Sequence, residues 1–234
     1  MRRNLCFIII LIFISCSPVR KYQSLPGVKG WESSILEFEK LDTIRTYTSD
    51  AILFTGSSSI ALWSTIEKDM APYPVIQRGF GGSRLIDFIV YADRIVSPHN
   101  CRAIVMFIAN DIIGNEQDRS PEDVASLFLN SLKIIRKSHP KTPVFWISVT
   151  PTPSRLKAWS EIKKANILIR DICSGEKNTY FIPTDFAFLN SDGLPVKEYF
   201  RPDMLHLNDQ GYKIWTSIIK KELNKIVPHS DLTD

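Results

Sequence analysis

The sequence predicts an α/β fold, a three-layer α/β/α sandwich in which a doubly wound, five-stranded parallel sheet lies between two layers of helices. Two observations predict it. Short apolar runs of strand length alternate along the chain with longer segments of helical periodicity. Several of the short runs are apolar at successive positions, as expected of strands that helices cover on both faces.

The predicted elements follow in strict alternation after a first helix over 31–45. The predicted strands cover 51–55, 75–77, 103–108, 144–149 and 179–182. The remaining helices are a segment that ends near 70, then 85–95, 121–138, 156–173 and 208–226. Gly56 marks the end of the first strand, and Ser120 with Pro121 is typical of a helix start.

The first sixteen residues have the pattern of an export signal. Arg2 and Arg3 precede an apolar run over 5–14, which is too short to span a bilayer comfortably. The ending Phe13-Ile14-Ser15-Cys16 resembles a bacterial lipoprotein lipobox, with Cys16 as the lipidated first residue of the mature chain. It departs from the usual pattern at Phe13, where Leu is commonest. The resemblance implies a lipid-anchored, membrane-associated protein of the bacterial cell envelope. The alternative is an ordinary signal peptide with an incidental cysteine.

After this signal the composition predicts one domain. We expect a tether over 17–30, a domain over 31–228 and a short tail over 229–234. The net charge of +4 includes Arg2 and Arg3, so the mature chain carries +2, which is too little and too dispersed for nucleic-acid binding. Cys101 and Cys173 are predicted to be buried small apolar residues, although an exported protein could pair them.

Polar residues gather where the predicted strands end. Three serines follow the first strand, a glycine-rich loop over 78–83 follows the second, and Asn110-Asp111 follows the third. Asp203 and His206 precede the last helix. Ligands of open α/β sheets bind at the carboxyl ends of the strands, so we expect these residues at one edge.

These residue types suit acyl transfer. Asp203 lies three residues before His206, so its carboxylate can fix the imidazole tautomer and leave the other nitrogen as a base. Such a base activates a serine, for which Ser58 is the candidate. The backbone N–H groups of Ser58 and Gly82 and the Asn110 amide would bind the oxyanion. Each piece also has an ordinary explanation as a helix cap, a tight loop, a turn or a surface histidine.

The order Ser, Gly, Asn, Asp-x-x-His resembles the SGNH (GDSL-type) hydrolases. Gly56-Ser57-Ser58 is similar to the first block in its Gly-Ser-Ser-Ser branch, Gly82 to the oxyanion glycine, Ile108–Asp111 to the third block and Asp203–His206 to the fifth. The resemblance implies a flavodoxin-like fold and a serine esterase that removes small acyl groups, such as acetyl, from carbohydrate or a related ester. It implies no cofactor and no metal.

One position departs from the family pattern. Ile108 stands where the family has Gly, which favours the alternative of a non-catalytic carbohydrate- or lipid-binding module on the same fold. If its side chain faces the site, it should restrict the acyl group; otherwise it turns into the core. Three other functional classes are disfavoured. Ile60 breaks an α/β-hydrolase elbow, no Gly-Lys-Ser/Thr supports a P-loop, and the histidines lack the paired spacing of a zinc site.

Overall fold

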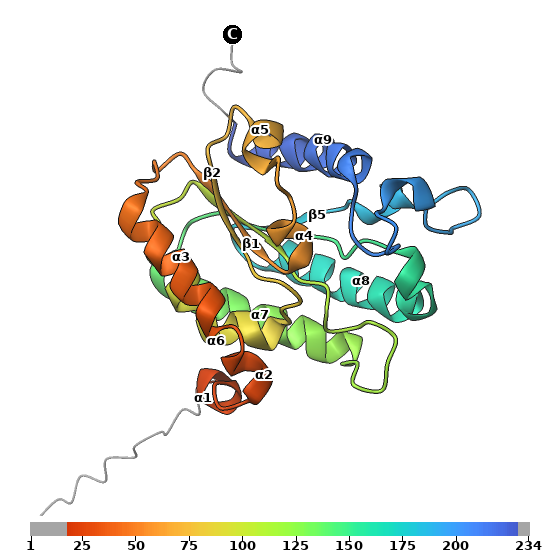
Figure 1. The fold of residues 1–234 in the computed structure, drawn as a ribbon, viewed down its shortest axis with the longest axis horizontal. Helices are drawn as coiled ribbons and strands as arrows, with labels where there is room; N and C mark the ends of the chain where they lie inside the picture. The colour runs from red at the N-terminus through yellow and green to blue at the C-terminus, as the bar shows by residue number, and fades with distance from the viewer. Residues whose placement is uncertain (1–17, 229–234) are drawn as a thin grey trace, which may run out of the picture.

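The computed structural model describes residues 18–228 and confirms the predicted fold class (Figure 1). Five parallel strands form one sheet in the order β2-β1-β3-β4-β5. Strand order reverses between β2 and β3, so the chain winds outward in both directions from β1. The strands are β1 (Ile52–Gly56), β2 (Val75–Gly79), β3 (Ala103–Phe107), β4 (Val144–Ile147) and β5 (Thr179–Ile182).

Helices cover both faces of this sheet (Figure 1). One layer contains α3 (Glu32–Ile44), α6 (Leu85–Val96), α7 (Pro121–Ser138) and α8 (Trp159–Gly175). The other contains α4 (Ser58–Ala61), α5 (Ile66–Met70) and α9 (Asp209–Ile226). The described chain also contains three short 3₁₀ segments, η1 (Pro153–Ala158), η2 (Asp185–Phe188) and η3 (Lys197–Tyr199).

The strands are apolar at successive positions because each face has its own core. Alternate side chains of a strand point to opposite faces. Leu53, Ile104 and Met106 lie in the core against α6, α7 and α8. Ile52 and Phe54 lie in the core against α5 and α9. Replacing any of these residues by a polar one would remove buried apolar surface from the core on that face.

The segment predicted to be a tether is folded from Pro18 onward. It forms α1 (Pro18–Tyr22) and α2 (Pro26–Lys29), and the side chain of Val28 is only 1% exposed. The Tyr91 hydroxyl of α6 donates a hydrogen bond of 3.1 Å to the Val28 carbonyl. The apolar side chains in this stretch therefore outweigh its prolines and glycines, and the fold begins before residue 31.

The helix predicted to end near residue 70 is divided into α4 and α5. The Gln77 side chain of β2 donates to the carbonyls of Ile60 and Trp63, at 2.7 and 3.1 Å. The Trp63 indole N–H donates to the Asp69 carboxylate at 2.7 Å. These bonds satisfy backbone and side-chain groups at the break between α4 and α5. The local sequence does not indicate this break, because two of the bonds come from β2.

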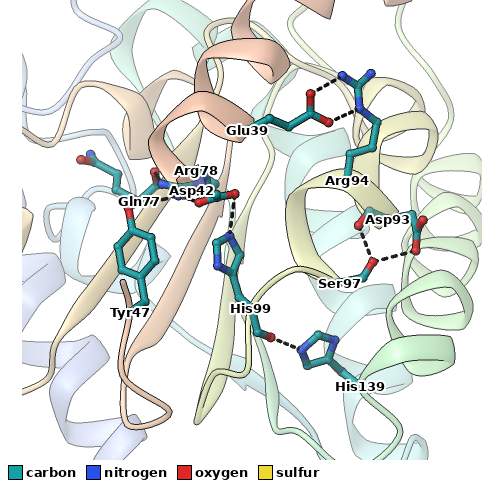
Figure 2. Close-up of polar contacts among 10 residues, drawn as sticks. All are labelled: Glu39, Asp42, Tyr47, Gln77, Arg78, Asp93, Arg94, Ser97, His99 and His139. Carbon is teal, nitrogen blue, oxygen red and sulfur yellow. Dashed lines mark hydrogen bonds and ion pairs between the residues drawn. The ribbon is translucent and has the colours of Figure 1, made fainter. Parts of the chain in front are cut away.

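A buried polar cluster joins α3 to the edge strand β2 (Figure 2). The guanidinium of Arg78, 2% exposed, forms an ion pair with Asp42 and donates to the Tyr47 hydroxyl at 3.1 Å. It also lies over the rings of Phe38 and Tyr47. The cluster gives a charge on the edge strand both a counter-ion and aromatic partners.

The cysteines behave as predicted, whereas the export signal is not tested. Cys101 and Cys173 are both buried and free. The signal, Cys16 and the tail over 229–234 lie outside the described residues. Within residues 18–228, every helix is too short or too polar to cross a membrane.

Candidate active site

The turn after β1 places Ser58 at the carboxyl edge of the sheet. Gly56 ends the strand with φ 137°, and a Cβ atom there would lie 1.9 Å from the Phe107 carbonyl oxygen of β3. Only glycine allows so close an approach. The Ser57 N–H then donates to the same carbonyl at 2.8 Å. Ser58 follows as the first residue of α4.

Ser58, His206 and Asp203 form one hydrogen-bonded series. The His206 Nε2 atom lies 3.0 Å from the Ser58 Oγ atom. The His206 Nδ1 atom lies 2.7 Å from Asp203 Oδ2. Because an ionised carboxylate only accepts hydrogen bonds, Nδ1 carries the proton and Nε2 is the free base facing the serine. The structure therefore brings together the three residues that the sequence singled out as nucleophile, base and orienting acid.

The Asp203 carboxylate is fixed by its own turn. Burial acts to raise its pKa, but hydrogen bonds from the His206 side chain and from the backbone N–H groups of His206 and Leu205 outweigh it and lower the pKa to about 2. The two backbone bonds to Oδ1 measure 2.9 and 3.0 Å. Asp203 is thus a carboxylate at any pH at which the protein would work.

Arg201, which sequence analysis did not single out, links this turn to the short helix that begins with Ser58. Its backbone N–H donates to the His206 carbonyl at 2.7 Å, and its Nε donates to the Leu207 carbonyl at 3.0 Å. Its Nη2 reaches the Leu62 carbonyl, the C-cap of α4, at 3.2 Å. Arg201 therefore fixes the distance between the helix of Ser58 and the turn of His206.

The Asn110 side chain lies in the same cavity as Ser58. Its Nδ2 donates to the Ser83 carbonyl at 3.1 Å, and its Oδ1 accepts from Arg155 Nη2 at 2.7 Å. An amide nitrogen has two hydrogens, so one N–H remains beyond the bond to Ser83. Arg155 is a site residue that sequence analysis missed, because it comes from η1, far from any recognised motif.

Gly82 is the least supported of the sequence-predicted site residues. It is exposed, and the residues lining the cavity do not include it. A positive φ occurs one position earlier, at Gly81, with φ 27°. Gly82 therefore does not owe its place to a left-handed conformation, and its part in the oxyanion hole stays a prediction.

A small cavity of about 20 Å³ lies at the serine. Its walls come from the ends of β1, β3 and β4, from η1 and from the turn that carries His206. They consist of Ser57, Ser58, Ser59, Phe107, Ala109, Asn110, Thr150, Thr152, Arg155, Leu205, His206 and Leu207. The buried Thr150 hydroxyl has no hydrogen-bond partner within residues 18–228. The cavity thus keeps a polar group available to a bound molecule.

A larger open cleft of about 810 Å³ adjoins the catalytic turn. Met204, between Asp203 and His206 in sequence, contributes to its wall, and the Ser154 N–H donates to the Met204 carbonyl at 3.0 Å. The other lining residues are Pro153, Leu156, Asn190, Leu194, Pro195, Val196, Lys197 and Glu198. The cleft therefore has apolar walls with a few polar groups.

Ile108 turns away from this cavity. It is 1% exposed and packs in the core with Met106, Ile112 and Val124. Period-two alternation carries Met106 and Ile108 to the same face, but β3 ends at Phe107, so the alternation does not continue to Asn110. Of the two sequence-based expectations, the one in which Ile108 enters the core is correct.

Acidic, histidine and cysteine side chains are scattered rather than grouped in the described part of the chain. Within 18–228, no three of them lie close enough together to hold a metal ion. The groups gathered at the cavity are a serine hydroxyl, an imidazole and a carboxylate in series, with the Asn110 amide as a hydrogen-bond donor beside them.

Several solved structures share this fold. A protein from Streptococcus pneumonia named as a candidate platelet activating factor is 20% identical with a TM-score of 0.74, over 84% of this chain and 94% of that one. A GDSL-like lipase from Bacteroides thetaiotaomicron is 16% identical with a TM-score of 0.68, over 82% and 98%. A carbohydrate esterase of family 3 from Talaromyces cellulolyticus is 15% identical with a TM-score of 0.57, over 75% and 97%.

The family assignment rests on the sequence match. Comparison with curated proteins finds no relative. The model of the GDSL-like Lipase/Acylhydrolase family matches residues 55–214, which is more than half of the chain and includes Ser58, Asn110, Asp203 and His206. The chain therefore belongs to the GDSL-like lipase/acylhydrolase family and is a carboxylic ester hydrolase.

Proposed function

We propose that this protein is a serine esterase that removes small acyl groups, acetyl above all, from a carbohydrate or related alcohol through an acyl-enzyme. The observation that carries the proposal is the series from Ser58 through His206 to Asp203, with contacts of 3.0 and 2.7 Å, at a cavity of about 20 Å³.

The geometry supports a two-step reaction. His206 Nε2 takes the Ser58 hydroxyl proton while Oγ attacks the ester carbonyl carbon, and the carbonyl oxygen becomes an oxyanion. His206 then gives that proton to the leaving alcohol oxygen as its bond to carbon breaks. Water, deprotonated by His206, attacks the carbonyl carbon of the acyl-enzyme. His206 then returns that proton to Ser58 Oγ as the acyl–oxygen bond breaks, which releases the carboxylic acid and restores the serine hydroxyl. Asp203 stays ionised and stabilises the imidazolium throughout.

The oxyanion would be held by the free N–H of Asn110, the backbone N–H of Ser58 and, in our proposal, the N–H of Gly82. The first backbone N–H groups of a helix have no acceptor within the helix, so that of Ser58 in α4 is available. Donors fixed before the reaction stabilise the developing charge without reorganisation.

The size of the cavity supports a small acyl group. A space of about 20 Å³ is little more than the roughly 10–15 Å³ that one water needs. A methyl group fits such a space, whereas a butyryl chain would require side chains such as Leu205 to move. Acetyl is therefore the acyl group that the resting cavity suits.

The cleft of about 810 Å³ supports a large alcohol on the other side of the ester. His206 protonates the leaving oxygen, so the alcohol must lie next to the turn that bears His206, and Met204 of that turn lines the cleft. Asn190, Lys197 and Glu198 offer polar contacts to a glycan. The fold shared with the carbohydrate esterase agrees with this choice. The alternative of a non-catalytic module loses its main support, because Ile108 does not fill the site.

Purified protein lacking residues 1–16 should hydrolyse p-nitrophenyl acetate. Ser58→Ala should lower kcat by several orders of magnitude, because no other group can form the acyl-enzyme. Ser59→Ala, one position along the same short helix, is the matched control and should have a much milder effect. Esters from acetate to octanoate should show a steep fall in kcat/KM with acyl length. Near-normal turnover by Ser58→Ala would refute the nucleophile assignment.

We also propose that the protein is exported and anchored through lipidated Cys16. The basic, apolar and Ser15-Cys16 segments over residues 1–16 support this. Cys16→Ser in the full chain should shift the protein from the membrane fraction to a soluble or uncleaved form. Unchanged fractionation, with no incorporation of labelled fatty acid into the wild type, would leave an ordinary signal peptide or a retained anchor.

A further inference from the structure

We propose that Arg155 is a positioning residue that fixes the Asn110 amide in the orientation needed to bind the oxyanion. The inference rests on the proposed esterase function and adds a residue that no motif of the sequence assigns. Arg155 lies in η1 after β4, and its guanidinium is part of the cavity wall at Ser58.

The contacts of Arg155 allow only one orientation of the amide. Its Nη2 donates to Asn110 Oδ1 at 2.7 Å, and its Nη1 donates to the Ala109 carbonyl at 2.6 Å. A guanidinium has five donors and no acceptor, so it must face the amide oxygen.

The opposite side of the amide meets a carbonyl, which makes the choice unambiguous. Asn110 Nδ2 donates to the Ser83 carbonyl at 3.1 Å. A rotation of the amide by 180° would set NH₂ against the guanidinium and oxygen against oxygen, so both bonds would become repulsive. The second N–H of Asn110 is thereby left for the oxyanion.

Charge adds to this geometric effect. Arg155 forms no ion pair within residues 18–228, since its bonded acceptors are the neutral oxygens of Ala109 and Asn110. Burial lowers the pKa of its guanidinium to about 10, with a smaller opposing effect of Asp118, so it is still charged at neutral pH. A cation at Oδ1 draws electron density from the amide and makes its N–H a stronger donor.

The backbone around Arg155 holds it in register with the catalytic turn. Its N–H donates to the Thr152 carbonyl at 3.1 Å, and the Ser154 N–H donates to the Met204 carbonyl at 3.0 Å. The segment that carries Arg155 is therefore bonded to the turn that carries His206, and Asn110 is set relative to both.

The decisive experiment is a double-mutant cycle with p-nitrophenyl acetate. Arg155→Met should lower kcat by about 10- to 100-fold with KM changed by less than about twofold, because the effect arises in the transition state; loss of an oxyanion donor, about 10²- to 10³-fold, is the upper limit. The kcat of Arg155→Lys should lie between those of Arg155→Met and the wild type, because the ammonium keeps the charge but cannot donate to both oxygens as the planar guanidinium does. In an Asn110→Ala background, Arg155→Met should change kcat by less than about threefold.

Arg136→Met is the matched structural control. Arg136 is also partly buried and also donates to backbone carbonyls, those of Thr142 and Asn178 among them, but it lies away from the cavity. Its substitution should lower the thermal midpoint and leave kcat per folded molecule unchanged. The positioning role is refuted if Arg155→Met leaves kcat unchanged, or lowers it by the same factor in the wild type and in the Asn110→Ala background.

A second readout does not depend on turnover. In ¹⁵N spectra, the side-chain amide pair of Asn110, assigned by its loss in Asn110→Ala, should shift and broaden in Arg155→Met but not in Arg136→Met. An unchanged Asn110 resonance would overturn the positioning role even in an active enzyme. A wild type without esterase activity whose Asn110 resonance responds as expected would instead reject the proposed function alone.

Discussion

Arg78 is buried and Arg155 is partly buried, and their surroundings differ. Arg78 lies in the edge strand β2 and faces α3, where it meets the Asp42 carboxylate and the Tyr47 hydroxyl (Figure 2). Its guanidinium also lies over the rings of Phe38 and Tyr47. Arg155 lies at the carboxyl end of the strands, and its bonded acceptors among residues 18–228 are neutral oxygens; burial lowers its pKa to about 10.

Arg78 is thus a paired cation that links two elements of the fold, whereas the charge of Arg155 is not neutralised by a carboxylate bonded to it. A buried charge is costly unless it is paired, so a region that serves stability pairs it. A catalytic cavity gains from a charge that its own protein does not neutralise, because negative charge develops there during the reaction. The comparison predicts that damage to the two regions appears in different measurements.

The largest expected effect on stability is at the paired cluster. Asp42→Ala leaves the Arg78 guanidinium buried without its counter-ion, and should lower the free energy of unfolding by about 3–5 kcal/mol. Urea unfolding measures this, and kcat/KM per folded molecule should stay within about twofold of wild type. Arg155→Met should show the reverse pattern, with the greater loss in kcat. Equal losses of unfolding free energy in Asp42→Ala and Arg155→Met would contradict the difference in role between the two regions.

A carboxylate beside the catalytic cavity allows a test by pH. Asp111 accepts from the Leu85 N–H at 2.9 Å and lies 3.4 Å from Arg119. Burial raises its pKa from 3.8 to about 6, although the Leu85 bond and the charges of Arg119 and Arg84 oppose this and Asp87 adds to it. Asp111 therefore resembles Arg155, because in both residues the interactions that favour the charged form do not fully offset the cost of burying it.

The sign of the pH effect follows from the raised pKa. Between about pH 4 and 6 the unfolded chain has released a proton that folded Asp111 keeps, so the free energy of unfolding should decrease as pH rises, by about 3 kcal/mol in total. It should level off above pH 6. Asp111→Asn should remove this part of the slope in urea unfolding, whereas the exposed Asp171→Asn should not. The assignment fails if the slope survives Asp111→Asn.

The smallest effect is expected where the chain departs from the family pattern. Ile108→Val removes one methyl group from the core behind the cavity and should cost about 0.5–1.5 kcal/mol of unfolding free energy. Because the side chain points away from Ser58, the profile of kcat/KM from acetate to octanoate should keep its shape. A relaxed profile in this variant would place Ile108 in the acyl pocket after all.

The fold and the grouping of Ser58 with His206 and Asp203 could be predicted because their signals are local or periodic. Apolar runs such as 103–108 indicate strands covered on both faces, and the ends of parallel strands must share one edge. This is why Ser58, Asn110 and the Asp203–His206 turn could be assigned to one site before any distance was known. Element ends were less certain: β3 stops at Phe107, one residue early, so the alternation that places Ile108 in the core with Met106 does not extend to Asn110.

The sequence by itself determined where the polar groups of the site stand relative to the elements. A serine follows β1, an amide follows β3 and a carboxylate–imidazole pair precedes α9. These positions can be predicted because they depend on spacing and periodicity along the chain. Tertiary structure alone decided that residues 18–30 fold, that Ile108 enters the core, that Asp42 meets Arg78 and that Arg155 meets Asn110. Each of these depends on contacts between residues far apart in sequence. A side chain's burial and partners are set by packing, which no local pattern records.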